Sequence, residues 1–230
     1  MTRFSGTPTA MLNRLIAAGA LAALTFAPAA FAQDSNDVQE APATEAAPAE
    51  EAAPVAQAPR VYAPIDYNIA NDPENILLLD LSNGKRVAIR LMPDWAPNHI
   101  ERVKTLTRAG FYDGVKFHRV IEGFMAQTGD PEGTGRGGMG ELLPAEFSKT
   151  PHTRGTVSMA RTNDPNSARS QFFIVLKDSN FLDGQYTVWG KVTSGMEFVD
   201  KIKKGAPGSG AVSAPPDKMI KVQVAADAKS

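Results

Sequence analysis

Hydrophobic residues in the last two thirds of the chain fall into short runs, and glycine- and proline-rich segments separate these runs. The first two runs, residues 76–79 (ILLL) and 87–91 (VAIRL), flank the segment SNGK at 82–85. An Asn-Gly pair supplies the positive φ angles that a tight hairpin turn needs. The pattern therefore predicts a β-hairpin near the start of the folded region.

Further short apolar segments with strand character follow this hairpin. They lie at residues 116–121, 123–127, 155–160, 171–176 and 186–192. Many short strands, few helices and no internal repeat predict a mainly β protein, either a closed antiparallel barrel or a sandwich. A barrel capped by two helices would leave no exposed sheet edge.

The pattern predicts a first helix from about Pro97, because proline suits a first helical position, where no N–H partner is needed. Gly110 ends this helix. Its inward side is marked by Ile100, Val103 and Leu106.

A second helix is predicted close to the end of the chain. Ser194 and Glu197 have the spacing of a capping box, and Gly205 would end the helix. Its apolar positions recur every third residue, at Met196, Val199 and Ile202.

Residues 1–32 have the features of a secretory signal peptide. Arg3 and Arg14 are basic, an apolar run covers 15–26, and Ala30-Phe31-Ala32 resembles an A-x-A cleavage site. The run is shorter than the roughly 20 residues of a membrane-spanning helix. We expect cleavage after Ala32, release into the periplasm and no stable membrane insertion.

Residues 33–60 contain six Asp and Glu against the single Arg60, with Ala, Pro and Gln making up most of the rest and no aromatic residue. Such a composition cannot bury enough apolar surface to offset the entropy of ordering. We expect a disordered linker over 33–64 and one folded domain over 65–226. Residues 61–230 carry 21 Lys and Arg and 19 Asp and Glu, a balance that does not indicate nucleic-acid binding.

Several motifs for other chemistries are present but incomplete. Residues 133–138 read G-x-G-x-x-G, yet no strand precedes and no amphipathic helix follows, which argues against a nucleotide site. These glycines instead indicate a loop that another backbone approaches closely. The chain has no cysteine and three histidines without ligand spacing, so no metal is expected, and His118 is interpreted as a core or supporting residue. Ser158 and Ser170 lack the nucleophile elbow of a hydrolase.

The stretch 117–127, FHRVIEGFMAQ, carries a stronger signal. Side chains of the same parity within a strand share a face, so Arg119 is expected beside Met125 and Gln127. Gly123 interrupts the run and predicts a bend or bulge. A second segment, 170–175, places Gln171 and Phe173 on one face.

Five segments, in order, resemble the signature blocks of the cyclophilin family. They are FHRVIEGFMAQTGD (117–130), GTVSMA (155–160), SQFFI (170–174), FLDG (181–184) and VWGKVTSGMEFVDKI (188–202). The resemblance implies a closed eight-stranded antiparallel β-barrel capped by two α-helices. It also implies peptidyl-prolyl cis-trans isomerisation without a cofactor or metal.

The resemblance also implies a set of site residues. Arg119 would be the catalytic arginine, acting with Phe124 and Gln127. The substrate-binding positions would be Met125, Gly135, Ala160, Arg161, Gln171, Phe173, Phe181, Leu182 and Tyr186. Arg161, Phe181 and Tyr186 replace Asn, Trp and His of the best-known eukaryotic members, and these replacements resemble those of bacterial periplasmic relatives. The change at Phe181 predicts weak cyclosporin affinity.

This chemistry needs no nucleophile, because no bond is made or broken. Amide resonance opposes rotation about the X-Pro bond with a barrier of about 18–20 kcal/mol. As the amide twists, the proline nitrogen gains a lone pair, to which the permanently charged Arg119 can donate a hydrogen bond. The expected partners are proline-containing unfolded or partly folded exported polypeptides, and the protein is expected to be a monomer. An alternative is a proline-peptide-binding chaperone module with little catalysis.

Overall fold

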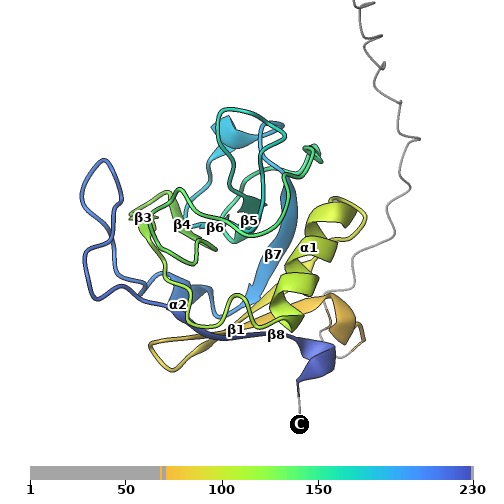
Figure 1. Ribbon diagram of the computed structural model, residues 1–230, viewed down its shortest axis with the longest axis horizontal. Coiled ribbons are helices and arrows are strands. Elements are labelled where there is room, and N and C mark those ends of the chain that lie inside the picture. The colour runs from red at the N-terminus through yellow and green to blue at the C-terminus, as the bar shows by residue number, and fades with distance from the viewer. Residues whose placement is uncertain (1–67, 69–70, 229–230) are drawn as a thin grey trace, which may run out of the picture. The chain divides into compact units, whose positions relative to one another are not determined.

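The computed structural model describes residues 68 and 71–228. The predicted signal peptide (1–32) and linker (33–64) lie outside the described residues. The elements come in the order η1 (Pro73–Asn75), β1 (Ile76–Leu81), β2 (Arg86–Leu91), α1 (Pro97–Arg108), β3 (Arg119–Ile121), β4 (Met125–Thr128), β5 (Thr156–Met159), β6 (Phe172–Val175), η2 (Asn180–Leu182), β7 (Val188–Ser194), α2 (Met196–Val199), β8 (Met219–Val224) and η3 (Ala225–Asp227). Figure 1 shows the strands curling around a common interior, with α1 beside the sheet.

The predicted hairpin at the start of the folded region is confirmed. β1 and β2 pair antiparallel, with Leu79 opposite Val87, and Gly84 in the turn has φ of 74°. Strands β3 to β7 fall on the predicted segments that follow, although β4 and β7 extend one and two residues further, to Thr128 and Ser194. All the ladders are antiparallel, and the order across the sheet is β3-β4-β6-β5-β7-β2-β1-β8.

The expectation of a closed barrel is wrong, because the sheet is an open, curled half-barrel. No ladder joins its two edge strands, β3 and β8. The segment 205–217 lies along β3 instead, where Val120 N–H donates to the Gly210 carbonyl and Gly205 N–H to the Val120 carbonyl. Isolated bridges at Lys116–Lys218 and Arg119–Ala211 complete the contact. Glycines and prolines in this segment do not support a regular ladder, yet the segment still covers the β3 edge.

Helix α1 is confirmed as predicted. It begins at Pro97, and its buried positions include Ile100, Val103 and Leu106, which pack into the main core. Its most extensive contact with the sheet is to β8. Gly110, just beyond the helix, has φ of 70°, a conformation that favours glycine.

Helix α2 is much shorter than predicted, and the expected capping box does not form. The helix covers only Met196–Val199 and makes no side-chain hydrogen bond at its N-cap. Ser194 belongs to β7, where it pairs with Ala88, so its side chain is not placed to cap a helix. Gly195 is the N-cap residue and has φ of 83°. The predicted helical position Ile202 lies beyond the helix but is still buried in the core.

Two apolar clusters lie on opposite faces of β4 and β6, because their side chains alternate along these strands. The larger one fills the interior and includes the fully buried Trp189, Tyr112 and Phe117. A separate, smaller cluster lies behind β4 and β6 and contains Met125, Phe173, Val175 and Leu182. Among the described residues, no helix is long and apolar enough to cross a membrane.

Candidate active site

The β3–β4 hairpin brings the predicted polar and apolar site residues together. Gly123, with φ of 67°, lies in its turn. The register places Arg119 opposite Gln127 and Ile121 opposite Met125, so the expectation that these side chains share a face is confirmed. On the other side of β4, β6 places Phe173 opposite Gln127.

These residues surround a cavity of about 240 Å³. Met125, Phe173 and Leu182 are buried and form its apolar floor. The rings of Phe124 and Phe181, 5.4 Å apart, stand at its edge, and Phe181 is 66% exposed. The complete lining is Arg119, Phe124, Met125, Gln127, Ala160, Arg161, Phe173, Phe181, Leu182 and Tyr186.

Hydrogen bonds to the protein fix two nitrogens of the Arg119 guanidinium and leave the third able to bind a ligand. Its Nε donates to the Ser209 carbonyl at 3.1 Å, and its Nη1 donates to Gln127 Oε1 at 3.3 Å. Arginine has five N–H donors. Within the described residues, Nη2 makes no hydrogen bond, so this nitrogen can donate to a ligand in the cavity.

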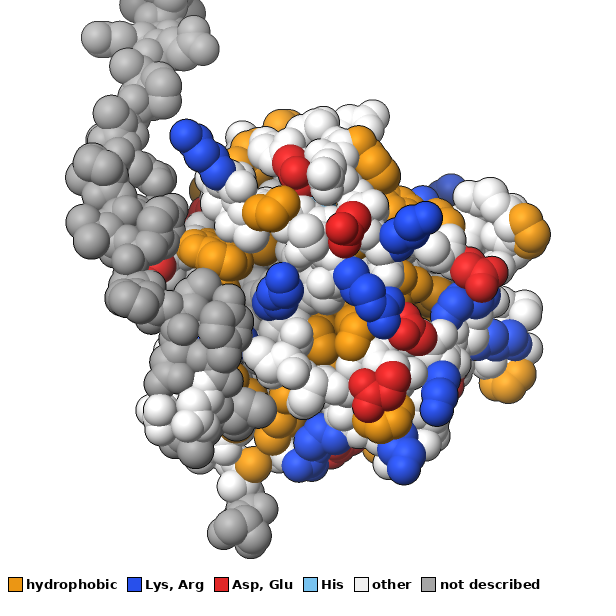
Figure 2. Space-filling view, turned by 180° about the vertical axis from the view of Figure 1, so that it is seen from behind, with side chains coloured by type: hydrophobic (Ala, Val, Ile, Leu, Met, Phe, Trp, Pro, Cys, Tyr) orange, Lys and Arg blue, Asp and Glu red, His pale blue; other side chains and the backbone are white. Residues whose placement is uncertain are grey.

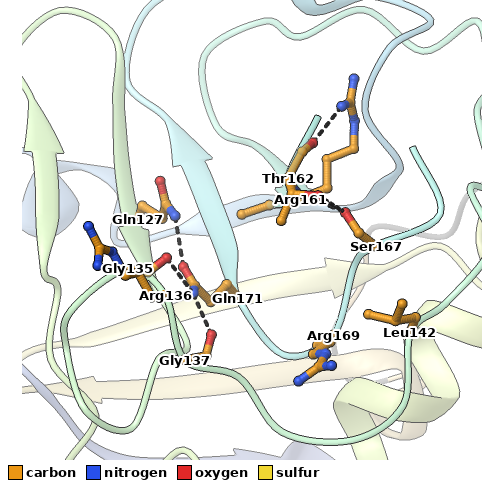
Figure 3. Close-up of a pocket in the computed structure, with 11 residues that line it drawn as sticks. Gln127, Gly135, Arg136, Gly137, Leu142, Arg161, Thr162, Ser167, Arg169 and Gln171 are labelled. Carbon is orange, nitrogen blue, oxygen red and sulfur yellow. Dashed lines mark hydrogen bonds between the residues drawn. The ribbon is translucent and has the colours of Figure 1, made fainter. Parts of the chain in front are cut away.

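A chain of amide hydrogen bonds orients Gln127. Its Nε2 donates to Gln171 Oε1 at 2.8 Å, and Gln171 Nε2 donates to the carbonyls of Gly135 and Gly137. Figure 3 shows these bonds side by side. Each amide nitrogen carries two hydrogens, so Gln127 keeps one N–H for a further acceptor.

The glycine-rich loop is built around the carboxylate of Asp130. This carboxylate accepts hydrogen bonds from the backbone N–H groups of Glu132, Thr134, Gly135 and Gly137 and from the Thr134 hydroxyl. Burial opposes ionisation of Asp130, but these N–H and O–H donors outweigh it and hold the pKa of Asp130 below its usual range. A Cβ on Gly137 would overlap the carboxylate. The group that approaches these glycines is therefore a side chain, and the expectation of a neighbouring backbone is wrong.

Arg161 and Tyr186, two of the substrate-binding positions expected from the sequence, form a pair. The guanidinium lies over the Tyr186 ring at 4.6 Å, a cation–π geometry. Arg161 Nε and Nη2 both donate to the Gln185 carbonyl. Both members of this pair line the 240 Å³ cavity.

His118 directly precedes β3. It is half-buried and lies beneath the glycine-rich loop. Its ring lies 3.5 Å from the position that a Cβ on Gly135 would occupy. Burial lowers the pKa of His118, with Asp130 opposing that effect, so the ring is neutral near pH 7. This supporting position agrees with the interpretation made from the sequence.

A serine, a histidine and an aspartate are hydrogen-bonded in series beneath the apolar floor, although the sequence around the serine has no nucleophile elbow. His152 Nε2 lies 2.9 Å from Ser158 Oγ, and its Nδ1 lies 2.9 Å from Asp183 Oδ1. Ser158 is fully buried, so a substrate carbonyl has no access to it. The His152 ring stacks on Phe173 at 6.3 Å, which makes the series a support for the floor. Its members come from separate elements and share no sequence motif.

The structure brings together every predicted site residue. Ten of them line the 240 Å³ cavity, and the other two, Gly135 and Gln171, line an adjoining one. Sequence reasoning missed Asp130, although its position just before the glycine-rich loop could have indicated that it organises the loop. It also missed Arg136 and Arg169, which line the adjoining cavity. Among the described residues, no cluster of His, Asp or Glu could hold a metal ion.

A curled antiparallel sheet with an arginine beside an apolar cavity defines a cyclophilin-like protein, and the comparisons agree. The chain is similar to the crystal structure of cyclophilin AquaCyp293 from Hirschia baltica, with a TM-score of 0.60 and 30% identity over 72% of this chain and 83% of that one. It is also similar to a cyclophilin type isomerase from Cryptosporidium parvum, solved in the presence of the dipeptide Ala-Pro (TM-score 0.59, 26% identity, 65% of this chain and 98% of that one).

The family model "Cyclophilin type peptidyl-prolyl cis-trans isomerase/CLD" matches residues 77–224. The chain is 53% identical over 173 residues to a probable peptidyl-prolyl cis-trans isomerase of Brucella suis, covering 70% of this chain and 87% of the relative. It is 43% identical over 127 residues to peptidyl-prolyl cis-trans isomerase B of Bacillus subtilis, covering 54% of this chain and 88% of the relative. The chain belongs to the cyclophilin-type peptidyl-prolyl cis-trans isomerase family. These relatives support isomerase activity and do not favour the binding-only alternative.

Proposed function

We propose that the 240 Å³ cavity binds the proline ring of the substrate and that Arg119 catalyses rotation of the X-Pro bond. One observation carries this proposal: no described residue binds the Nη2 of Arg119, while the rest of the guanidinium is fixed beside a buried apolar floor. That arrangement combines a cationic donor with a pocket for an apolar ring. The similar Cryptosporidium parvum protein was solved in the presence of Ala-Pro, which supports a proline-containing ligand here.

The required rate enhancement is within reach of such a site. Uncatalysed exchange takes about 10–100 s. Reaching milliseconds requires about four decades in rate, or about 5–6 kcal/mol of transition-state stabilisation. Only interactions that strengthen in the twisted state contribute to this figure. A preorganised hydrogen-bond donor aimed at developing electron density contributes about 3–4 kcal/mol in enzymes where one has been removed.

Arg119 supplies that donor at the nitrogen, and Gln127 holds the other end of the amide. When the amide twists, resonance is lost and the lone pair localises on the proline nitrogen, toward which Nη2 would donate. The remaining N–H of Gln127 Nε2 would bind the carbonyl of the residue before proline. The floor formed by Met125, Phe173 and Leu182 keeps water from the ring side and strengthens both hydrogen bonds.

The wider biological assignment is also part of this proposal. Arg3, Arg14 and the apolar run 15–26 support export and release into the periplasm after cleavage behind Ala32. Substrates would then be unfolded or partly folded exported polypeptides, which the protein would bind as a monomer. The replacements at Arg161, Phe181 and Tyr186 support a relationship to the bacterial periplasmic kind.

The purified protein and its Arg119→Ala variant separate catalysis from simple binding. We expect the wild-type protein to accelerate cis-trans exchange of a proline tetrapeptide and the variant to lose nearly all of this acceleration. Lys177→Ala, an exposed charge outside the cavity, is the control and should behave as wild type. Suppression of aggregation of an unfolded protein is measured in parallel. Full isomerase activity in Arg119→Ala would refute the proposed role of the arginine.

A further inference from the structure

A second cavity adjoins the proposed proline pocket. It has a volume of about 410 Å³ and shares Gln127, Ala160 and Arg161 with the first cavity. The two cavities therefore adjoin at these three residues, and together they are called the groove. A polypeptide bound by its proline ring in the first cavity would pass over the second.

The described residues that line the second cavity include cationic side chains and no carboxylate. Arg136, Arg161 and Arg169 all contribute to its lining, and in the part of the chain that the structure describes no Asp or Glu lines either cavity. Figure 3 shows the three arginines around the cavity on different sides. Together with Arg119, they give the groove four guanidinium groups, although the chain as a whole has a net charge of −1. Elsewhere on the surface, Figure 2 shows acidic and basic side chains interspersed.

Among residues 71–228, no carboxylate forms an ion pair with these four arginines. Within the described residues, the side chains of Arg136 and Arg169 are exposed and make no hydrogen bond or ion pair. Arg161 donates to the neutral carbonyls of residues 162, 163 and 185. Asp130 lies beneath the glycine-rich loop, and the loop's own N–H groups bind its carboxylate. An anionic group in the cavity would therefore meet unpaired positive charge.

We propose that this second cavity is a subsite for an acidic side chain of the substrate, two or three residues before the proline. The inference rests on the proposed function, which places the carbonyl of the residue before proline at Gln127. An extended chain advances about 3.3–3.6 Å per residue, so the next residues toward the N-terminus lie over the second cavity. Arg136 and Arg169 are then specificity-determining residues that select Asp or Glu at those positions.

The test uses acetyl-capped peptides of the form Ac-X-Ala-Pro-Phe-amide, with X as Glu, Gln or Lys, and magnetisation-exchange NMR to measure kcat/KM. An acetyl cap avoids the extra carboxylate of a succinyl group. We expect Glu to exceed Gln by about threefold to tenfold at low ionic strength, the size of partly exposed ion pairs, and Lys to fall below Gln. The preference should shrink in about 1 M salt, where the screening length is about 3 Å. Glu placed two residues after the proline, in Ac-Ala-Ala-Pro-Phe-Glu-amide, should give no preference.

The double variant Arg136→Gln/Arg169→Gln should bring the Glu-to-Gln ratio close to one, whereas Lys177→Gln removes one charge elsewhere and should keep the ratio. Equal kcat/KM for the Glu and Gln peptides, or a preference that survives in the double variant, would overturn the subsite. That result leaves isomerisation of all the peptides intact. Failure of the proposed function is a different outcome, in which the protein accelerates exchange of none of them.

Discussion

Replacing Asp130 by alanine tests how the glycine-rich loop supports the site. The carboxylate accepts five hydrogen bonds at 2.7–3.2 Å, four from backbone N–H groups and one from the Thr134 hydroxyl. The same loop supplies the two carbonyls that hold Gln171. Gln171 in turn holds Gln127. Loss of the carboxylate should therefore affect both stability and catalysis.

The expected loss of stability follows from these bonds. A hydrogen bond to a charged group contributes about 1.5–3 kcal/mol on its own. The five share one carboxylate, and water can reach the exposed Thr134 and Gly135, so their contributions do not add fully. We expect Asp130→Ala to lower the free energy of unfolding by about 3–5 kcal/mol, similar to breaking a buried charged network. For a chain of this size, this corresponds to a fall in Tm of about 10 °C.

Asp130→Asn is the matched comparison. It keeps one acceptor oxygen but places an N–H₂ group where the other oxygen accepts, so we expect about half of the alanine effect. In both variants kcat/KM should fall, by about tenfold to a hundredfold for alanine, because Gln127 loses its support.

Urea unfolding followed by tryptophan fluorescence measures the stability, since Trp189 is fully buried. Asp94→Ala, at an exposed aspartate without a side-chain hydrogen bond among the described residues, is the control. An Asp130→Ala variant with wild-type unfolding midpoint and wild-type kcat/KM would show that the loop holds its shape without the carboxylate.

Three further predictions concern pH and inhibitor binding. kcat/KM should be nearly independent of pH from about pH 6 to 9, since no titrating group takes part and arginine stays charged over that range. A bell-shaped pH profile of kcat/KM centred near 7 would instead implicate His118. Burial lowers the pKa of His152 although Asp183 opposes this effect, so the folded state favours the neutral ring. The stability that this group contributes is complete above the unfolded pKa of about 6.5 and is lost as pH falls toward the folded pKa. The urea midpoint should therefore decline from about pH 7 to 5 in wild type, and less steeply in His152→Gln. Equal declines of the midpoint with pH in the two proteins would contradict this assignment. Phe181→Trp should strengthen cyclosporin binding in a fluorescence titration, and unchanged affinity would remove Phe181 as the cause of the weak binding that we expect.

Local patterns predicted the parts of the fold that depend on neighbouring residues. Asn83-Gly84 and Gly123 mark the two hairpin turns, and the parity of Arg119 and Gln127 gives their common face. The site residues themselves were identified by resemblance to cyclophilin motifs. Their arrangement around one cavity follows from the pairing of β4 with both β3 and β6.

Features that depend on distant contacts could not be predicted in this way. The sheet stays open because the segment 205–217, and not β8, lies along β3. No apolar pattern singled out β8, whose buried positions do not alternate regularly and whose pairing with β1 shifts register at Asp80. The Ser194 capping box failed because strand pairing with Ala88 outweighed the local helix signal.

The central claim is that Arg119 stabilises the twisted amide more than it stabilises the bound ground state. NMR line-shape analysis of a proline peptide titrated with the protein separates the rate of isomerisation on the enzyme from the Kd. For Arg119→Gln we predict an on-enzyme rate lower by about a hundredfold to a thousandfold, with a Kd within a few-fold of wild type. An unchanged on-enzyme rate together with a weaker Kd would contradict the account, because Arg119 would then only bind the substrate.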